Sequence, residues 1–416
     1  GRSRGLGDVY KRQASIELRK DRLNRCIKMI KEYSDEIIDA LQKDFGNRDP
    51  KSSFLTEIAT TIGVLQHAIK NVDKWTKDEK RPSNVDRPFF IRMLMGFLGS
   101  KSYIKYQPLG TVGVISPWNF PVNLILAPLG GIFAAGNRAM IKPSELTPAT
   151  SEVTKRMFEA YFDKSEAAVF TGDAEVGAAF SALPFDHLLF TGGTQIGKKV
   201  MKAASDNLVP VTLELGGKSP VIVDENADLS DVAKKVMRGK TMNAGQICLA
   251  PDYLMLPKGK SEEFAKASNE AISEMFADLK YNEDYTSVIN ERHYERINEL
   301  VSDAKEKGAE VIQINPADED FEQQELHKIP PTLVLNPTDE MKIMQEEIFG
   351  PVLPVKEYED FDETVNYVNS KDRPLGLYLF SKDKNKEKKV LDNTTSGGVT
   401  LNDAVSYTHL TLPTMS

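Results

Sequence analysis

The chain has few cysteines and few histidines for its length. Only two cysteines, Cys26 and Cys248, occur in 416 residues, so no disulfide framework can hold the fold, and a reducing compartment, the cytoplasm, is expected. The five histidines are scattered along the sequence. Because metal ligands and Cys–His catalytic pairs require such side chains in groups, the sequence predicts no metal site and argues against a cysteine–histidine hydrolase.

A long apolar run and an excess of positive charge are also missing. The longest apolar stretch, residues 124–135, is interrupted by Pro128 and is too short to cross a bilayer. The formal net charge is −8, and the basic residues alternate with acids or follow helix faces, which argues against a nucleic-acid partner. With 40% hydrophobic and 27% charged residues the chain is typical of a globular protein, and its length predicts two or three domains.

Both ends of the sequence lack a pattern of secondary structure. Residues 1–13 carry charge but have neither the apolar core nor the cleavage site of a secretory signal, and residues 404–416 are equally patternless. We therefore expect both segments to be non-native additions.

Helical spacing dominates the N-terminal part. The apolar residues of 23–41 recur with a helical period and predict one amphipathic helix, in which Cys26 is a buried packing residue. A second helix is expected over 54–76. Prolines then end helicity in a bridging segment, near 82–107, and the alternation at 102–107 predicts a strand.

From residue 110 onward, short apolar runs alternate with helical patterns, which indicates a doubly wound parallel sheet. The expected strands cover residues 111–116, 139–142, 167–171, 187–191 and 211–215, and the helices between them cover 124–135, 150–161, 174–183 and 196–205. A ligand should bind beyond the carboxyl ends of these strands, where the sequences SPWNFP, KPSE, TGD and FTGG fall.

A second alternating set follows and predicts a second α/β domain that begins near residue 215. Its expected strands cover residues 221–224, 253–256, 310–314, 332–335 and 398–401, and its helices cover 229–241, 261–279, 293–307 and 361–370. The fold class is therefore α/β, with two domains.

Cys248 is the leading candidate for a nucleophile. It closes the sequence NAGQIC, about thirty positions after the sequence LELGGKSP that contains Glu214. A thiol with an ordinary pKa of roughly 8.5 is mostly protonated at pH 7, so the site must activate it. Glu214 lies between two leucines, where burial raises a carboxyl pKa and suits a general base acting on water. The alternative is an inert cysteine and a structural acid paired with a lysine such as Lys218.

Three loops at strand ends carry further candidates. Asn119 in SPWNFP is an uncharged donor suited to a developing oxyanion, and Trp118 beside it is, from position alone, a packed aromatic residue. The FTGG turn, residues 190–193, exposes amide groups that can bind phosphate, although a plain turn is the simpler interpretation of this motif alone. Lys142 and Glu145 in KPSE either bind the ribose hydroxyls of a dinucleotide or are a solvated lysine and an acid near a helix cap.

Taken together, these sequences resemble the aldehyde dehydrogenase superfamily. The resemblance rests on SPWNFP, KPSE, FTGGTQIG, LELGGKSP, NAGQIC and QEEIFGP (345–351), which occur in this order between residues 23 and 403. The sequences CLAPDY, GLYLFS and TTSGGVTLND are similar to the branch that contains the class-three and coniferyl aldehyde dehydrogenases. The resemblance implies a dinucleotide-binding domain over 14–214 and a catalytic domain over 215–403.

The resemblance also implies a reaction, the oxidation of a medium or long aliphatic or an aromatic aldehyde to its carboxylic acid. Cys248 is expected to form a thiohemiacetal whose oxyanion is held by the Asn119 amide and the Cys248 N–H, and Glu214 to activate the water that hydrolyses the later thioester. The hydride passes to NAD or NADP, with Glu145 favouring NAD. Cofactor contacts are implied for Lys142, Glu145, Phe190, Thr191, Gly192, Gly193, Glu347 and Phe349, with Trp118 near the supporting loop.

The sequence departs from the family pattern at its end. After Asp403 the family continues to a helix and a strand that complete a homodimer, whereas a different sequence follows here. The implied partners are the aldehyde substrate and a second copy of the full-length protein, with membrane association only through an anchor in the missing part. Two alternatives stay open, namely a truncated, non-catalytic dinucleotide-binding fragment and a thiol esterase.

Overall fold

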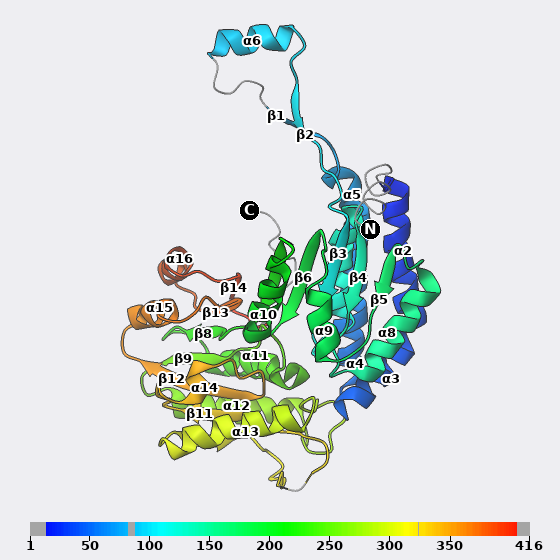
Figure 1. Ribbon diagram of the computed structural model, residues 1–416. Helices are drawn as coiled ribbons and strands as arrows, with labels where there is room; N and C mark the ends of the chain where they lie inside the picture. Colours follow the sequence, from blue (N-terminus) through cyan, green and yellow to red (C-terminus); the bar gives the residue numbers. More distant parts are fainter. Residues whose placement is uncertain (1–13, 82–87, 323, 406–416) are drawn as a thin grey trace.

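The computed structural model describes residues 14–81, 88–322 and 324–405, and these residues form two α/β bodies and a projecting arm (Figure 1). The N-terminal segment 1–13, expected to be non-native, lies outside the described residues. Of the corresponding C-terminal segment 404–416 only the first two residues are described, and the first of them, Ala404, is buried.

The N-terminal helices pack against the first body. The single helix expected over 23–41 is wrong, because the chain forms α2 (Ile16–Glu32) and α3 (Ser34–Phe45) with a break at Tyr33, whose φ and ψ are −95° and 11°. The apolar period continues through this break, so periodicity alone does not detect it. The helical stretch expected over 54–76 is present as a run of consecutive helical segments: α4 (Pro50–Ser53), a π-helical segment (Phe54–Ala59) and α5 (Thr60–Trp75).

The first body is built on a five-stranded parallel sheet in the order β5-β4-β3-β6-β7. Its strands are β3 (Thr111–Ile115), β4 (Arg138–Lys142), β5 (Ala167–Val169), β6 (His187–Gly192) and β7 (Val211–Leu215). The crossover helices are α7 (Asn123–Ala134), α8 (Pro148–Tyr161), α9 (Ala174–Ser181) and α10 (Thr194–Ser205). Since all strands are parallel, their carboxyl ends share one edge, and the expected doubly wound sheet is confirmed.

Helices cover both faces of this sheet. One apolar core joins β3 and β4 to α2, α3, α5, α7 and α8, and it includes Cys26, which is fully buried as expected. A second core joins β6 to α9 and α10 on the other face. The chain leaves this sheet at Leu215 and enters the next sheet at Pro220, so the second α/β body begins close to the expected position.

The second body holds a seven-stranded sheet in the order β10-β11-β12-β9-β8-β13-β14, in which only β10 runs antiparallel to its neighbour. Its strands are β8 (Pro220–Val223), β9 (Tyr253–Pro257), β10 (Glu310–Gln313), β11 (Thr332–Leu335), β12 (Val352–Tyr358), β13 (Gly376–Phe380) and β14 (Gly398–Leu401). Its helices are α11 (Leu229–Thr241), α12 (Ser261–Met275), α13 (Glu291–Glu306), α14 (Lys342–Gln345), α15 (Phe361–Asn369) and α16 (Lys384–Asn393).

The sequence did not predict strands β12 and β13. All of β13 and the first four residues of β12 are buried, and such stretches lack the alternation that marks a half-exposed strand. Pro354 inside β12 adds a residue that argues against a strand, yet it pairs in register with Val334 of β11.

The bridging segment forms the arm. Strands β1 (Glu79–Arg81) and β2 (Ser102–Ile104) pair in antiparallel fashion and carry helix α6 (Phe89–Phe97) at the far end (Figure 1). The strand expected over 102–107 is therefore shorter, and α6 was not expected at all. Pro88 immediately precedes α6, a position where proline favours a helix start rather than ending a helix. In the described part of the chain, no helix is long and apolar enough to span a bilayer.

Candidate active site

The shared carboxyl edge of the first sheet collects the loops that the sequence singled out. The loop after β3 carries Trp118 and Asn119, the loop after β4 carries Glu145, and the turn after β6 carries Gly193. Glu214 lies on β7, paired in register with Thr191 of β6. Parallel topology thus brings together residues that are up to ninety-six positions apart in sequence.

Cys248 sits on a tightly bent loop of the second body. After α11, the residues Asn243, Ala244 and Gly245 have φ values of 48°, 53° and 71°, a run in the left-handed region that costs free energy for the two non-glycine residues. A Cβ atom at Gly245 would overlap the Gly350 carbonyl, so glycine permits close contact with the following QEEIFGP loop.

Gln246 holds this bent loop in place. Its buried side-chain Nε2 donates to the carbonyls of Asn243 and Ser287 at 2.9 and 3.0 Å, and its Oε1 accepts from the Ile289 N–H at 2.9 Å. Two residues further on, Cys248 is half-buried and packs in the apolar cluster that contains Phe120. The sulfur therefore lies beside the SPWNFP loop of the first body.

Asn119 is tied directly to the cysteine loop. Its side-chain Nδ2 donates to the Gln246 carbonyl at 3.1 Å, and its side chain is buried. A carboxamide has two N–H hydrogens, so this bond occupies one of them and orients the second. The loops that carry Asn119 and Cys248 are thus fixed relative to each other across the two bodies.

Two residues that the sequence did not indicate anchor the Asn119 loop. Arg48 Nη1 donates to the Asn119 carbonyl at 3.0 Å, and Arg48 Nη2 lies 3.0 Å from Glu57 Oε1 in a buried ion pair. Glu57 Oε2 accepts from the N–H groups of Val122 and Asn123 at 3.1 and 2.7 Å. Burial raises the pKa of Glu57, and the Arg48 guanidinium and the two N–H donors oppose that shift. No sequence motif indicates that Arg48 contacts the Asn119 loop, because Arg48 and Asn119 are 71 positions apart.

Glu214 and Glu347 set the electrostatics around the sulfur. Burial raises the pKa of the Glu214 carboxyl. Burial, Glu347 and Glu214 in turn raise the pKa of the Cys248 thiol to about 12, while the backbone N–H groups of Cys248 and Leu249 oppose the shift. The site as it stands therefore holds a neutral thiol, and attack by sulfur requires a proton acceptor or added positive charge nearby.

Glu347, whose charge also affects the Cys248 thiol, is a half-buried residue. Burial, then the charge of Asp252, raises the pKa of Glu347 to about 7, and the N–H of Gly217 opposes the shift. The Glu347 carboxylate occupies the space that a Cβ atom at Gly216 would need. The glycine pair of LELGGKSP therefore serves close packing against Glu347.

Lys218 does not pair with Glu214. Its Nζ forms an ion pair with Asp252 and donates to the carbonyls of Ile343 and Glu346 at 2.7 and 3.0 Å. Asp252 Oδ2 accepts from the Ile348 N–H at 2.9 Å. The Lys218–Asp252 pair fixes the loop that carries Glu347, and the structural alternative of a Glu214–Lys218 pair is wrong.

An aromatic cluster packs against the loop that carries Glu347 and Phe349. The Trp118 ring lies 5.3 Å from Phe349 and 5.0 Å from His293, both with edge-to-face geometry. Phe349 has a φ of 49°, so this contact holds a strained backbone conformation. Burial, with Arg292 and Arg296 nearby, lowers the pKa of His293 to about 4, and the imidazole is therefore neutral near pH 7. His293 is a site neighbour that the sequence did not indicate.

The carboxyl edge of the first sheet also carries groups that could contact a dinucleotide. Helix α10 begins at Thr194, and its N-cap residue Gly193 provides no side-chain cap, so the first N–H groups and the dipole of the helix are available to an anion such as a pyrophosphate. The buried Lys142 Nζ lies 2.8 Å from the Pro143 carbonyl and 3.5 Å from the carboxylate of Glu145, whose side chain is exposed. The Phe190 ring, by contrast, is buried beneath Gly192 and shapes the turn from below.

No metal centre accompanies this arrangement. Within residues 14–81, 88–322 and 324–405, no three His, Cys, Asp or Glu side chains are grouped so that they could hold a metal ion. The chemistry available here is that of a thiol, two carboxyl groups with raised pKa values and an oriented amide.

Comparisons with known proteins identify the family of this chain. The family model described as "Aldehyde dehydrogenase family" matches residues 10–414. The chain is 54% identical to a probable coniferyl aldehyde dehydrogenase of Caulobacter vibrioides, with 97% of this chain and 83% of that protein covered. It is 50% identical to the coniferyl aldehyde dehydrogenase of a Pseudomonas species, with 96% and 81% covered. The substrate-bound structure of Staphylococcus aureus AldH superposes with a TM-score of 0.86 at 37% identity, covering 96% of this chain and 84% of that one.

Proposed function

This chain belongs to the aldehyde dehydrogenase family, and we propose that Cys248, Asn119 and Glu214 perform its reaction as nucleophile, oxyanion donor and general base. It is an NAD(P)-dependent aldehyde dehydrogenase. The matched region holds both α/β bodies and all three of these residues, which argues against the alternative of a non-catalytic dinucleotide-binding fragment.

In the proposed reaction, the Cys248 sulfur adds to the carbonyl carbon of the aldehyde, and the thiol proton leaves to a neighbouring carboxylate. The negative charge that develops on the carbonyl oxygen is held by the Asn119 amide and the Cys248 backbone N–H. Loss of a hydride from the substrate carbon converts the thiohemiacetal into a thioester, and an oxidised nicotinamide cofactor, when bound, would supply the hydride acceptor. Glu214 then takes a proton from water, which attacks the thioester carbon, breaks the C–S bond and releases the carboxylic acid.

The observation that carries this assignment is the 3.1 Å bond from Asn119 to Gln246, two residues before the cysteine. It fixes the donor relative to the sulfur across the two bodies. The role of Glu214 is supported by its charge, which helps to raise the pKa of the Cys248 thiol. A raised pKa also suits Glu214 to take a proton from water near neutral pH.

We propose further that Lys142 and Glu145 hold the ribose of the adenosine half of the cofactor, and that Gly192 and Gly193, with Thr191, border the pyrophosphate. Glu347 and Phe349 would hold the nicotinamide ribose, with Trp118 supporting their loop. An exposed carboxylate at Glu145 favours NAD, because it repels the 2′-phosphate of NADP.

The substrate class we propose is an apolar, conjugated aromatic aldehyde of the coniferyl type. The two relatives at 54% and 50% identity carry this substrate in their names. Medium and long aliphatic aldehydes are the second candidate substrates.

A homodimer and a cytoplasmic location remain predictions.

The test measures formation of the reduced nicotinamide by its absorbance, with coniferaldehyde, decanal and acetaldehyde as substrates and with NAD and NADP as cofactors. We expect coniferaldehyde with NAD to give the highest kcat/KM. A preference for acetaldehyde would overturn the proposed substrate class. Hydrolysis of activated esters without any cofactor-dependent aldehyde oxidation would instead support a thiol esterase.

A further inference from the structure

Asn47 and Arg48 are neighbouring residues that bond to opposite bodies. Both are buried between the end of α3 and the start of α4. Asn47 Nδ2 donates to the Tyr285 carbonyl at 2.7 Å, and the Ser287 N–H donates to the Asn47 carbonyl at 2.9 Å, so Asn47 holds the segment that precedes α13 of the second body. Arg48 Nη1 donates to the Asn119 carbonyl at 3.0 Å, in the loop after β3 of the first body. One dipeptide therefore spans the joint between the two bodies.

These bonds belong to a closed ring of hydrogen bonds around the joint. Asn119 Nδ2 donates to the Gln246 carbonyl at 3.1 Å. The Gln246 side chain donates to the Ser287 carbonyl at 3.0 Å and accepts from the Ile289 N–H at 2.9 Å. Ser287 leads back to Asn47 through its own N–H. The ring thus passes through the dipeptide, the loop that carries Asn119, the cysteine loop and the segment before α13.

The ring is shielded from water. The exposed fractions of Asn119, Gln246 and Ser287 are 3%, 0% and 0%. Ile289, which belongs to the second body, is buried in the apolar core of the first body. Because no water molecule can replace a lost partner there, buried polar groups are held to their hydrogen bonds more strictly than exposed ones. The ring is therefore a rigid connection between the two bodies.

The side chain of Asn47 suits the acceptors that it faces. Besides the Tyr285 carbonyl, its Nδ2 lies 3.3 Å from the Glu283 carbonyl and 3.4 Å from the Asn282 carbonyl. A carboxamide supplies two N–H hydrogens to such a group of oxygens, whereas a carboxylate would place negative charge against them. An amide at position 47 is therefore required by the segment that it holds.

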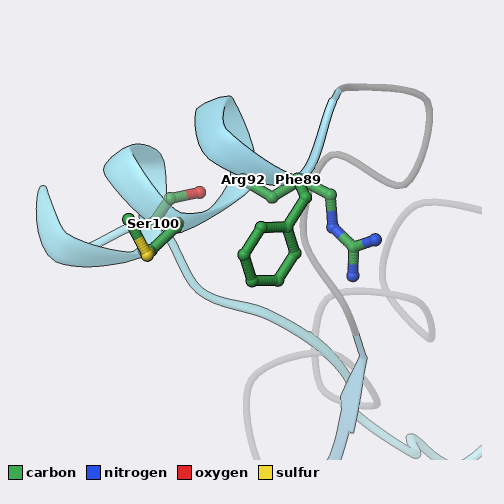
Figure 2. A pocket seen from close by; sticks show the side chains of 5 residues that line it. Phe89, Arg92 and Ser100 are labelled. Atoms are coloured by element: carbon green, nitrogen blue, oxygen red, sulfur yellow. The ribbon is translucent and has the colours of Figure 1, made fainter.

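All residues of this ring lie outside the arm. Helix α6 is at the far end of the arm, away from both bodies (Figure 1), and Figure 2 shows the side chains of Phe89 and Arg92 beside a hollow on this helix. Substitutions in the ring leave the arm unchanged, so their effect on the reaction rate does not arise there.

We propose that Asn47 and Arg48 form a clasp, a pair of positioning residues that keep the amide of Asn119 in register with the cysteine loop. The inference rests on the proposed role of Asn119 as the oxyanion donor. Arg48 holds the carbonyl of Asn119, and Gln246 accepts from its side chain. Asn47 fixes the segment to which Gln246 is bonded, so a loss of Asn47 loosens the acceptor relative to the donor. A misplacement of roughly 1 Å between reacting groups costs about 10²-fold in rate.

The test uses two variants that open the clasp on opposite sides. Asn47→Ala removes the side-chain bonds to the second body. Arg48→Lys keeps a positive charge beside Glu57 but lacks the planar fork that also reaches the Asn119 carbonyl. Each variant should lower kcat with an aldehyde and NAD by about 10- to 100-fold. The KM for NAD should change by less than about twofold, because the clasp acts on the transition state and not on cofactor binding.

A second readout needs no cofactor. Hydrolysis of para-nitrophenyl acetate by the same cysteine also develops an oxyanion, so the two clasp variants should slow it by a similar factor. An unchanged ester rate in variants that lose dehydrogenase activity would contradict a clasp that acts through Asn119.

A double-mutant cycle separates positioning from general stability. Asn119→Ala alone should lower kcat by about 10²–10³-fold, as the loss of an oxyanion donor does. Adding Asn47→Ala or Arg48→Lys to Asn119→Ala should lower kcat by less than about twofold more, since the amide that the clasp positions is then absent. Clasp effects of equal size with and without the Asn119 side chain would overturn the inference.

Asn137→Ala is the matched control. Asn137 is a buried amide of the first body whose Oδ1 accepts from the Gly110 N–H at 3.0 Å, just before β4 and at the amino edge of the sheet. This variant should lower the melting temperature but leave the kcat of the folded protein unchanged. A loss of kcat in Asn137→Ala as large as that in Asn47→Ala would assign the loss to stability alone and reject the clasp.

The cycle also distinguishes failure of the clasp from failure of the proposed function. If Asn119→Ala lowers kcat while both clasp variants keep the kcat of the parent, the clasp is wrong and the oxyanion donor stands. If Asn119→Ala keeps the kcat of the parent, the proposed role of Asn119 is wrong and the clasp falls with it.

Discussion

The guanidinium of Arg48 and the carboxylate of Glu57 form a fully buried ion pair, 3.0 Å apart, beneath the loop that carries Asn119. This pair satisfies one backbone carbonyl and two backbone N–H groups of the stretch from Asn119 to Asn123. The orientation of the proposed oxyanion donor therefore depends on two residues that do not contact the sulfur.

Glu57→Gln should destabilise the protein by about 3–5 kcal/mol, because it leaves the Arg48 charge buried without its partner. Chemical denaturation gives the free energy of unfolding. The matched control is Glu36→Gln, which breaks the exposed Arg156–Glu36 pair at 2.7 Å and should change stability by less than about 1 kcal/mol. Equal effects of the two variants would show that burial of the Arg48–Glu57 pair is unimportant.

Cys248→Ser should lower both dehydrogenase and esterase activity by about 10⁴-fold or more, since the nucleophile serves both reactions. Steady-state rates with an aldehyde and with an activated ester measure the two. The control is Cys26→Ser, which alters the other cysteine in the fully buried core of the first body. That variant should lose stability but keep its activity when folded, and retained activity in Cys248→Ser would remove this cysteine from the chemistry.

Glu214→Gln should slow hydrolysis of the thioester by about 10²–10⁴-fold, because an amide cannot take the proton from water. Rapid mixing with NAD and aldehyde should then give a fast burst of reduced nicotinamide followed by slow turnover. A burst that slows as much as the steady state would contradict the role of Glu214 as the base of the second half-reaction.

Glu347→Gln should change how stability depends on pH. The folded protein raises the pKa of Glu347 to about 7, above its ordinary value of 4.5, so the folded state binds this proton more tightly than the unfolded state. The free energy of unfolding therefore falls as the pH rises from about 4.5 to 7, and the variant should be more stable than the parent above pH 7 by about 1–3 kcal/mol.

Melting temperatures of parent and variant across this pH range test the Glu347 prediction. Glu299→Gln, at an exposed position on α13, is the matched control and should leave the pH profile of the parent unchanged. Parallel profiles for the parent and Glu347→Gln would show that this carboxyl does not titrate in the stated range.

Glu145→Ser should shift cofactor preference toward NADP, because it removes the carboxylate proposed to repel a 2′-phosphate. We expect the ratio of kcat/KM with NADP to that with NAD to rise by about tenfold. Glu152→Ser, which removes an exposed carboxylate from the neighbouring helix α8, should leave the ratio unchanged. An unchanged ratio in Glu145→Ser would place the ribose elsewhere.

Much of the fold followed from local pattern. The bounds of β7, β11, β14 and α11 agree with the sequence prediction, because each is a short apolar run or an amphipathic period bounded by turn residues. The local pattern did not predict the helix break at Tyr33, strand β12 or helix α6. The kink at Tyr33 continues an unbroken apolar period, and β12 contains a proline that its neighbours tolerate. Helix α6 was missed because its apolar residues face no core.

By itself the sequence determined the two α/β bodies, the loops at the carboxyl edge and the chemical types of the candidate residues, since these depend on local periodicity and on which side chains are present. Only the tertiary structure decided which groups act on one another. The Arg48–Glu57 anchor, the bond from Asn119 to Gln246 and the pairing of Lys218 with Asp252 join segments far apart in the chain. Their energies depend on burial and distance, which no local pattern encodes.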